Sequence, residues 1–196
     1  LIDPTSAEGL KAVFYQVFVG VLMGILLQIV NAALIIGGQA VSASMGLSMA
    51  NMVDPSMGNV PVIAQFFVIC STLIFLGLGG HVLVISLLLE SFELLPINST
   101  LDLQGLLKLT IEWSAMMFVG AILIGLPLMA SLLFINIGLG VITRTAPALN
   151  IFAVGFPAMI LAGIVLLSLS MTSIGYRIQW LWQESFEIIG QALGIR

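Results

Sequence analysis

Charged residues are rare along this chain, and they divide it into long apolar stretches. Lys11 and Asp54 enclose 42 uncharged residues, and Asp54 and Glu90 enclose 35. Two more stretches, of 31 and 32 uncharged residues, lie on either side of Arg144. A helix that crosses a membrane needs about 20 apolar residues, so each stretch is long enough for one span. The stretches show no strict alternation of apolar and polar residues, which favours helices over a β-barrel.

Glycine and proline mark the expected breaks between these helices. The segment Asp54–Pro61 contains two prolines, a glycine and an asparagine, and it is the clearest predicted loop. A second loop is predicted at residues 96–104, a hinge at Gly37–Gly38 and a weak point at Gly77–Gly80. Helices are therefore expected at residues 11–36, 39–53 and 61–95, from the second loop to 144, and at 149–171, with kinks at Pro127 and Pro157.

The last helix, expected at residues 176–193, has a different pattern. Its polar residues fall on one helical face and its apolar residues largely on another. The polar face holds Arg177, Glu184, Glu187 and Gln191, and the apolar face holds Ile178, Leu181, Trp182, Ile188, Ile189 and Leu193. Such an amphipathic helix suits a membrane interface or a partner. The loops are short, so residues 1–196 are expected to form a single domain.

Composition narrows the class of protein further. Of the 196 residues, 7% are charged and 60% are hydrophobic, and the mean hydropathy is +1.23. A soluble domain usually carries about 25% charged residues, so a free cytosolic enzyme is excluded. Five cations in a chain of net charge −4 provide no basic patch, which excludes nucleic acid as a partner. The chain starts with Leu1, and an N-terminal part is expected to be missing.

Few residues could carry chemistry. Cys70 and His81 are separated by eleven residues, about 16 Å along a helix, which is too far for a shared metal. We therefore expect no metal, no cofactor and no catalytic group. Glu90 and Glu93 could form a proton relay, but a helix end that emerges into water or pairs with a neighbouring cation is the favoured interpretation. Arg144, beside a proline break, is interpreted as an end anchor or an intersubunit contact.

Methionines cluster just before the Asp54–Pro61 loop. Met45, Met49 and Met52 follow a helical spacing, and Met57 lies within the loop. The spacing fits ordinary packing against lipid or the core. It also fits a pliable seal that leads into a plug, because the unbranched methionine side chain adapts to irregular shapes.

Three blocks of residues, in order, resemble the FliR family of flagellar biosynthetic proteins. The first is Gln39-x-x-Ser42, Met45-Gly46-Leu47, Val53-Asp54-Pro55 and Asn59-Val60-Pro61-Val62. The second is Gly80-His81-x-x-x-Ile85-Ser86-Leu87-Leu88-x-Glu90-Ser91-Phe92-x-x-Leu95-Pro96. The third is Asn136-x-x-Leu139-Gly140-x-x-x-Arg144-x-x-Pro147-x-Leu149-Asn150-Ile151-Phe152-x-x-Gly155-Phe156-Pro157. These blocks extend over most of the chain.

The resemblance implies an all-α membrane protein without catalytic activity. It implies bent helical hairpins, with kinked hydrophobic helices, that join a helical hetero-oligomeric export gate in the bacterial inner membrane, at the flagellar basal body. Several copies of FliP and of FliQ, together with FlhB, are the implied partners, beside membrane lipid. Unfolded flagellar subunits are the implied cargo. The family is longer at its N-terminus. Two alternatives stay open: an injectisome homologue, and an unrelated small-solute transporter with Glu90, Glu93 and Arg144 as its ionic path.

The resemblance also assigns roles to particular positions. The Asp54–Pro61 loop falls where the family places the plug of the closed pore. The residues implied in the pore and plug are Met45, Met49, Met52, Asp54, Pro55, Met57, Gly58, Asn59 and Pro61. The residues implied in subunit contacts are Glu90, Glu93, Asn136, Arg144, Pro147, Asn150, Phe156 and Pro157.

Overall fold

The computed structural model describes residues 7–47, 62–96, 103–145 and 151–195, and these residues are almost entirely helical. No strand occurs in these four ranges. The helices are α1 (Ala7–Ser44), α3 (Val62–Gly77), α4 (Gly80–Leu94), α5 (Leu103–Ser114), α6 (Met116–Thr145) and α7 (Ile151–Ala192). The expected all-α class is confirmed.

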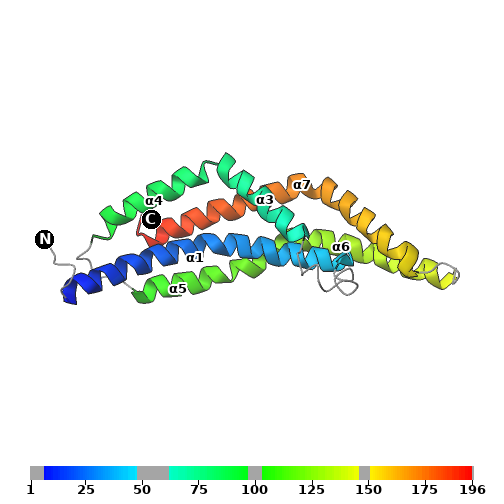
Figure 1. The fold of residues 1–196 in the computed structure, drawn as a ribbon, viewed down its shortest axis with the longest axis horizontal. Coiled ribbons are helices and arrows are strands. Elements are labelled where there is room, and N and C mark those ends of the chain that lie inside the picture. Colours follow the sequence, from blue (N-terminus) through cyan, green and yellow to red (C-terminus); the bar gives the residue numbers. More distant parts are fainter. Residues whose placement is uncertain (1–6, 48–61, 97–102, 146–150, 196) are drawn as a thin grey trace.

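The helices lie side by side in an elongated bundle (Figure 1). The long helix α1 forms its axis and packs most extensively against α6 and α3, and also against α7 and α5. Helices α6 and α7 extend beyond the C-terminal end of α1, whereas α4 diverges from the bundle on the side of α3 (Figure 1). The start of α1 and the end of α7 lie at the same end of the molecule (Figure 1).

The predicted hinge at Gly37–Gly38 is wrong, because α1 runs through both glycines without a break. The glycines serve close packing instead. A Cβ at Gly38 would overlap the backbone of Ala64 in α3, and a Cβ at Gly37 would lie 3.1 Å from the carbonyl oxygen of Ala121 in α6. Small residues let helix backbones approach each other inside a membrane. The glycine pair therefore brings two different helices onto α1 at one level.

The weak point at Gly77–Gly80 is a real break. Helices α3 and α4 are bent by 66° at this place, and the pair has the length and composition of one broken membrane span. Gly79 precedes α4 with φ of 71°, a left-handed conformation that residues with a Cβ rarely adopt. The sequence placed this bend correctly because the local conformation itself requires glycine.

Two other boundaries differ from the sequence expectation. The helix predicted to end at 144 is divided at Ala115, where α5 gives way to α6. The helices predicted at 149–171 and 176–193 are one helix, α7. Pro127 lies inside α6 and Pro157 inside α7, and neither proline ends its helix.

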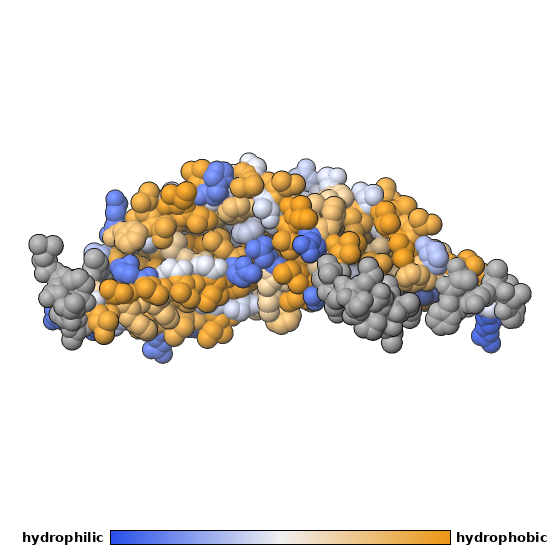
Figure 2. All heavy atoms as spheres, viewed as in Figure 1, coloured by the Kyte–Doolittle hydropathy of each residue, from blue (hydrophilic) through white to orange (hydrophobic). Residues whose placement is uncertain are grey.

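Apolar side chains occupy both the interior and much of the surface. The amphipathic pattern of 176–193 is confirmed, because Ile178, Leu181, Trp182, Ile189 and Leu193 are all buried. Large exposed hydrophobic side chains nevertheless occur on every helix, and apolar atoms cover much of the face in Figure 2. Three helices have the length and apolarity of membrane spans, or up to four if the bent pair forms one. A soluble protein does not expose apolar surface on this scale, so the chain is a membrane protein.

Candidate functional site

The candidate site is the C-terminal end of α1, where the predicted pore loop begins. The last turn of the helix is firmly held, since Val41 and Met45 are each only 1% exposed. Gly46 follows with φ of 79°, and its backbone N–H donates a 3.0 Å hydrogen bond to the carbonyl oxygen of Ala43. A left-handed glycine of this kind is a common helix terminator. Leu47, the next residue, packs against the core.

Helix α7 provides the surface on which this helix end rests. The side chain of Met45 lies directly over Gly163, where a Cβ would overlap three of its atoms. About two turns towards the start of α7, two ring carbons of Phe156 lie 3.5 and 3.7 Å from the position of a Cβ on Gly46. Met45 therefore packs over Gly163 and Gly46 packs beside the ring of Phe156, and we call this contact the α1–α7 stem.

Helix α3 holds the other side of the same region. It begins at Val62, the first described residue after the predicted loop. Ala64, two residues further on, is 1% exposed and packs against Gly38 of α1. The segment 48–61 therefore leaves from one firmly packed helix end and returns to another. The nearest described residues on either side of the predicted loop, Met45–Leu47 and Val62–Ala64, are therefore held in packed helix ends.

Of the predicted pore residues, the structure describes only Met45. Met45 is buried in the α1–α7 stem, where it contacts Gly163. The others, namely Met49, Met52, Asp54, Pro55, Met57, Gly58, Asn59 and Pro61, lie outside the described residues. The methionine seal and the plug therefore stay predictions.

The predicted subunit-contact residues fall on three helices. Glu90 and Glu93 are exposed near the end of α4, and Asn136 and Arg144 are exposed on α6. On α7, Pro157 is exposed, whereas Phe156 is half-buried because it faces Gly46. Pro147 and Asn150 lie outside the described residues. The end of α4 and the end of α6 lie at opposite ends of the molecule, so the two glutamates do not approach Arg144 (Figure 1).

Sequence reasoning missed a polar and aromatic contact that joins α3 to α7. The indole N–H of Trp182 donates a 2.8 Å hydrogen bond to Ser71 Oγ, and both side chains are buried. The Phe75 ring lies 4.6 Å from that of Trp182, centre to centre. The apolar face of the last helix indicated that Trp182 would be buried, but no local signal identified its partner 111 residues away.

Cys70 and His81, for which no shared metal site is expected, lie on different helices. Cys70 is half-buried in α3, and His81 is exposed at the start of α4, beyond the bend. In the described part of the chain, no three His, Cys, Asp or Glu side chains come close enough to hold a metal ion. The ion pair found there, Lys108–Glu112 at 3.9 Å, is exposed and lies within α5.

Comparison with known proteins identifies the family. The pattern of the family described as "Bacterial export proteins, family 1" matches residues 2–185. The flagellar biosynthetic protein FliR of Pectobacterium carotovorum is 34% identical over 96% of this chain and 72% of its own length. FliR of Escherichia coli K12 is 34% identical over 91% of this chain and 69% of its own, and FliR of Aquifex aeolicus 30% over 94% and 71%. The chain therefore belongs to family 1 of the bacterial export proteins, the family of the flagellar biosynthetic protein FliR.

Proposed function

We propose that the chain is a structural, pore-forming subunit of the flagellar type III protein export gate in the bacterial inner membrane. In this proposal the Asp54–Pro61 loop is the plug of the channel for unfolded flagellar subunits. The observation that carries it is the packing of the two described helix ends on either side of this loop, by Met45 on Gly163 and by Gly38 on Ala64. A plug must stay in place to block ions and small molecules, and packed helix ends on either side of the segment 48–61 favour such a role.

The exposed apolar surface supports a role inside a larger assembly. On α4 only Gly80 and Ser91 are buried, while large side chains such as Leu89 and Phe92 are 64% and 57% exposed. Surfaces of this kind are covered by lipid or by other subunits. FliP and FliQ, each in several copies, and FlhB are the proposed partners, and the exposed residues Glu90, Glu93, Asn136 and Arg144 are the proposed contact points.

The alternatives are less well supported. A small-solute transporter would need its charged groups along one path, but Glu90, Glu93 and Arg144 lie at opposite ends of the molecule (Figure 1). The relatives named above are all flagellar proteins, which favours the flagellar system over an injectisome.

Co-expression with FliP and FliQ, followed by detergent extraction and native mass spectrometry, tests the proposal. We expect a discrete hetero-oligomer that contains one copy of this chain. A monomer or homo-oligomer that ignores both partners would contradict the proposal and return attention to the transporter.

A second experiment separates the plug from mere assembly. Residues 54–61 are deleted in one variant and replaced by an equally long glycine–serine segment in another. Both variants are expected to assemble with FliP and FliQ but to let ions pass across the membrane. Ion tightness equal to that of the unaltered protein in both variants would refute the plug while leaving the subunit role intact.

A further inference from the structure

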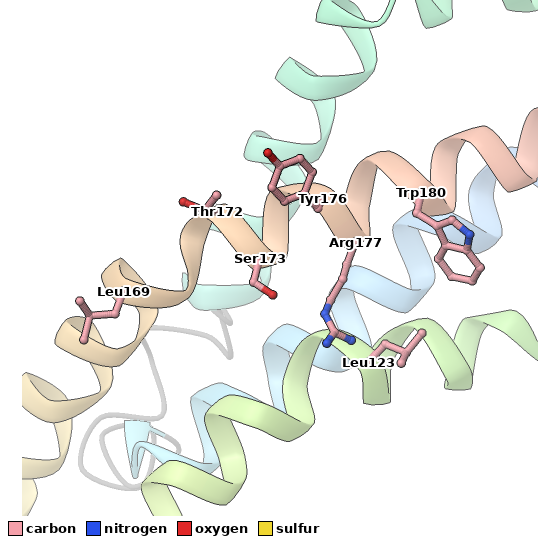
Figure 3. A pocket seen from close by; sticks show the side chains of 7 residues that line it. All are labelled: Leu123, Leu169, Thr172, Ser173, Tyr176, Arg177 and Trp180. Carbon is pink, nitrogen blue, oxygen red and sulfur yellow. The ribbon is translucent and has the colours of Figure 1, made fainter.

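An open hollow of about 700 Å³ lies between α6 and α7, and its lining begins at Leu169, about 9 Å along α7 from Gly163 of the α1–α7 stem. Its lining combines apolar side chains with a cation, hydroxyl groups and two large aromatic rings. The lining residues are Leu123 from α6 and Leu169, Thr172, Ser173, Tyr176, Arg177 and Trp180 from α7. Figure 3 shows Arg177 reaching from α7 towards α6, with its guanidinium group beside Leu123 and with Ser173 on the same side.

Arg177 has no partner of opposite charge in the described part of the chain. It forms no ion pair or hydrogen bond with any residue that the structure describes, although its side chain is half-buried. Helix α6, which it faces, contains no Asp or Glu. The next carboxylates along α7, Glu184 and Glu187, are seven and ten residues away, about 10 and 15 Å along the helix. No carboxylate of the described residues therefore neutralises this half-buried guanidinium group, whose N–H donors suit an anion.

The position of the hollow along the helices indicates which anion. From Arg144 back to Leu123, α6 covers about 32 Å, and from Ile151 to Thr172, α7 covers about the same length. Between these limits the hairpin is uncharged, and its length matches the hydrocarbon layer of a bilayer, about 30 Å. Arg177 therefore lies just beyond one edge of a hydrocarbon-length segment, as Arg144 marks the other.

The side chains around Arg177 are those that lie at the membrane–water boundary. Trp and Tyr are enriched at the level of lipid headgroups. Trp180 is 39% exposed and Tyr176 is 70% exposed, which places both rings at the surface of the molecule. Leu169 lies about two turns before Arg177 on α7 and is 77% exposed, so the apolar surface continues from it in the direction away from the cation. The site thus has a polar end at Arg177 and an apolar end at Leu169, which match the headgroup and the acyl chain of a phospholipid.

We propose that this hollow binds an anionic phospholipid, with its phosphate on Arg177 and Ser173 and its acyl chain along Leu123 and Leu169. Guanidinium groups bind phosphate through two parallel hydrogen bonds, and a nearby hydroxyl can donate a third. The bound lipid neutralises the unpaired cation and fills the space between the helices. It would hold the α6–α7 hairpin at a fixed depth in the membrane.

The test uses the full-length protein in nanodiscs of phosphatidylcholine with and without phosphatidylglycerol, followed by native mass spectrometry of the retained lipid. We expect phosphatidylglycerol to be retained in preference to phosphatidylcholine. Arg177→Gln should lower this retention about tenfold, the effect of losing a hydrogen bond to a charged group, and Arg177→Lys should keep part of it. Lys108→Gln, which removes an exposed cation on α5, should not change it.

A second variant keeps the cation of Arg177 but reduces the volume of the hollow. Leu123→Trp fills the hollow and should reduce lipid retention although Arg177 is intact. Equal retention by Arg177→Gln and the unaltered protein would overturn the proposal. Displacement of the lipid by millimolar inorganic phosphate would assign the site to free phosphate instead. If Arg177→Gln weakened assembly with other subunits in detergent without phospholipid, a carboxylate of a partner would be the anion and the lipid site would be refuted.

Discussion

Trp182 of α7 and Ser71 of α3 are joined by a buried hydrogen bond of 2.8 Å between residues 111 positions apart in the sequence. Ser71 is fully buried, so no water replaces it as the acceptor. Phe75, one turn further along α3, packs its ring against the same indole. This contact fixes α3, the helix that follows the predicted plug loop, to the C-terminal half of α7.

Replacing the acceptor is therefore expected to destabilise the protein. Ser71→Ala leaves the indole N–H of Trp182 buried without a partner, which costs about 1–3 kcal/mol. Thr72→Ala is the matched control, because Thr72 is exposed and its hydroxyl donates only to the carbonyl oxygen of Val68 in its own helix. Unfolding of both variants in detergent, followed by circular dichroism, measures the difference. Equal stability of the two would show that the Trp182–Ser71 bond contributes nothing.

The glycine pair in α1 makes a second prediction. Gly38→Ala places a Cβ against the backbone of Ala64. Backbone atoms cannot move aside by a change of rotamer, so α3 must move away from α1. Overpacking of this kind costs about 1–3 kcal/mol. Gly24→Ala on the same helix meets no atom within 4 Å and should be neutral or stabilise the helix by up to about 1 kcal/mol. The unfolding midpoint in detergent should fall for Gly38→Ala, whereas for Gly24→Ala it should stay unchanged or rise.

The α1–α7 stem allows the proposed plug to be tested without touching the loop. Gly163→Leu fills the hollow that holds Met45, so the end of α1 must shift. If the loop is the plug, the assembled gate should leak ions several-fold more than the unaltered protein. Gly175→Leu, on the same helix with no atom within 4 Å of its Cβ position, should not increase leakage. If the gate with Gly163→Leu did not leak ions, the α1–α7 stem would not be needed to hold the proposed plug.

The predicted parts of the fold are those that local chemistry determines. The bend at Gly77–Gly80 was predictable because Gly79 adopts a left-handed conformation that its own residue type permits. The buried face of 176–193 was predictable because helical periodicity alone separates Trp182 from its polar neighbours. Both features are visible within a window of a few residues.

The parts that were missed depend on residues far apart in the sequence. A glycine pair inside a helix can be a hinge or a close contact, and only the positions of Ala64 and Ala121 decide that Gly37–Gly38 is a contact. Conversely, Gly20 and Gly24 have the spacing of a helix-packing motif, but a Cβ on either meets no described atom within 4 Å. The same limit applies to the site, where the helical spacing of Met45 gave no sign that Gly163 would receive it.

A shared acceptor in the core provides the last prediction. The carbonyl oxygen of Leu26 in α1 accepts a 3.2 Å hydrogen bond from Trp113 Nε1 and a 3.3 Å bond from Ser185 Oγ. Trp113→Phe or Ser185→Ala alone leaves the carbonyl one of these donors, so each should cost about 1 kcal/mol. The double variant removes both side-chain donors but leaves the carbonyl its backbone bond within α1, so its cost should lie within about 0.5 kcal/mol of the sum of the singles. Unfolding free energies of the four proteins in detergent measure this sum, and a larger deviation would mean that the contacts of α5 and α7 with α1 depend on each other.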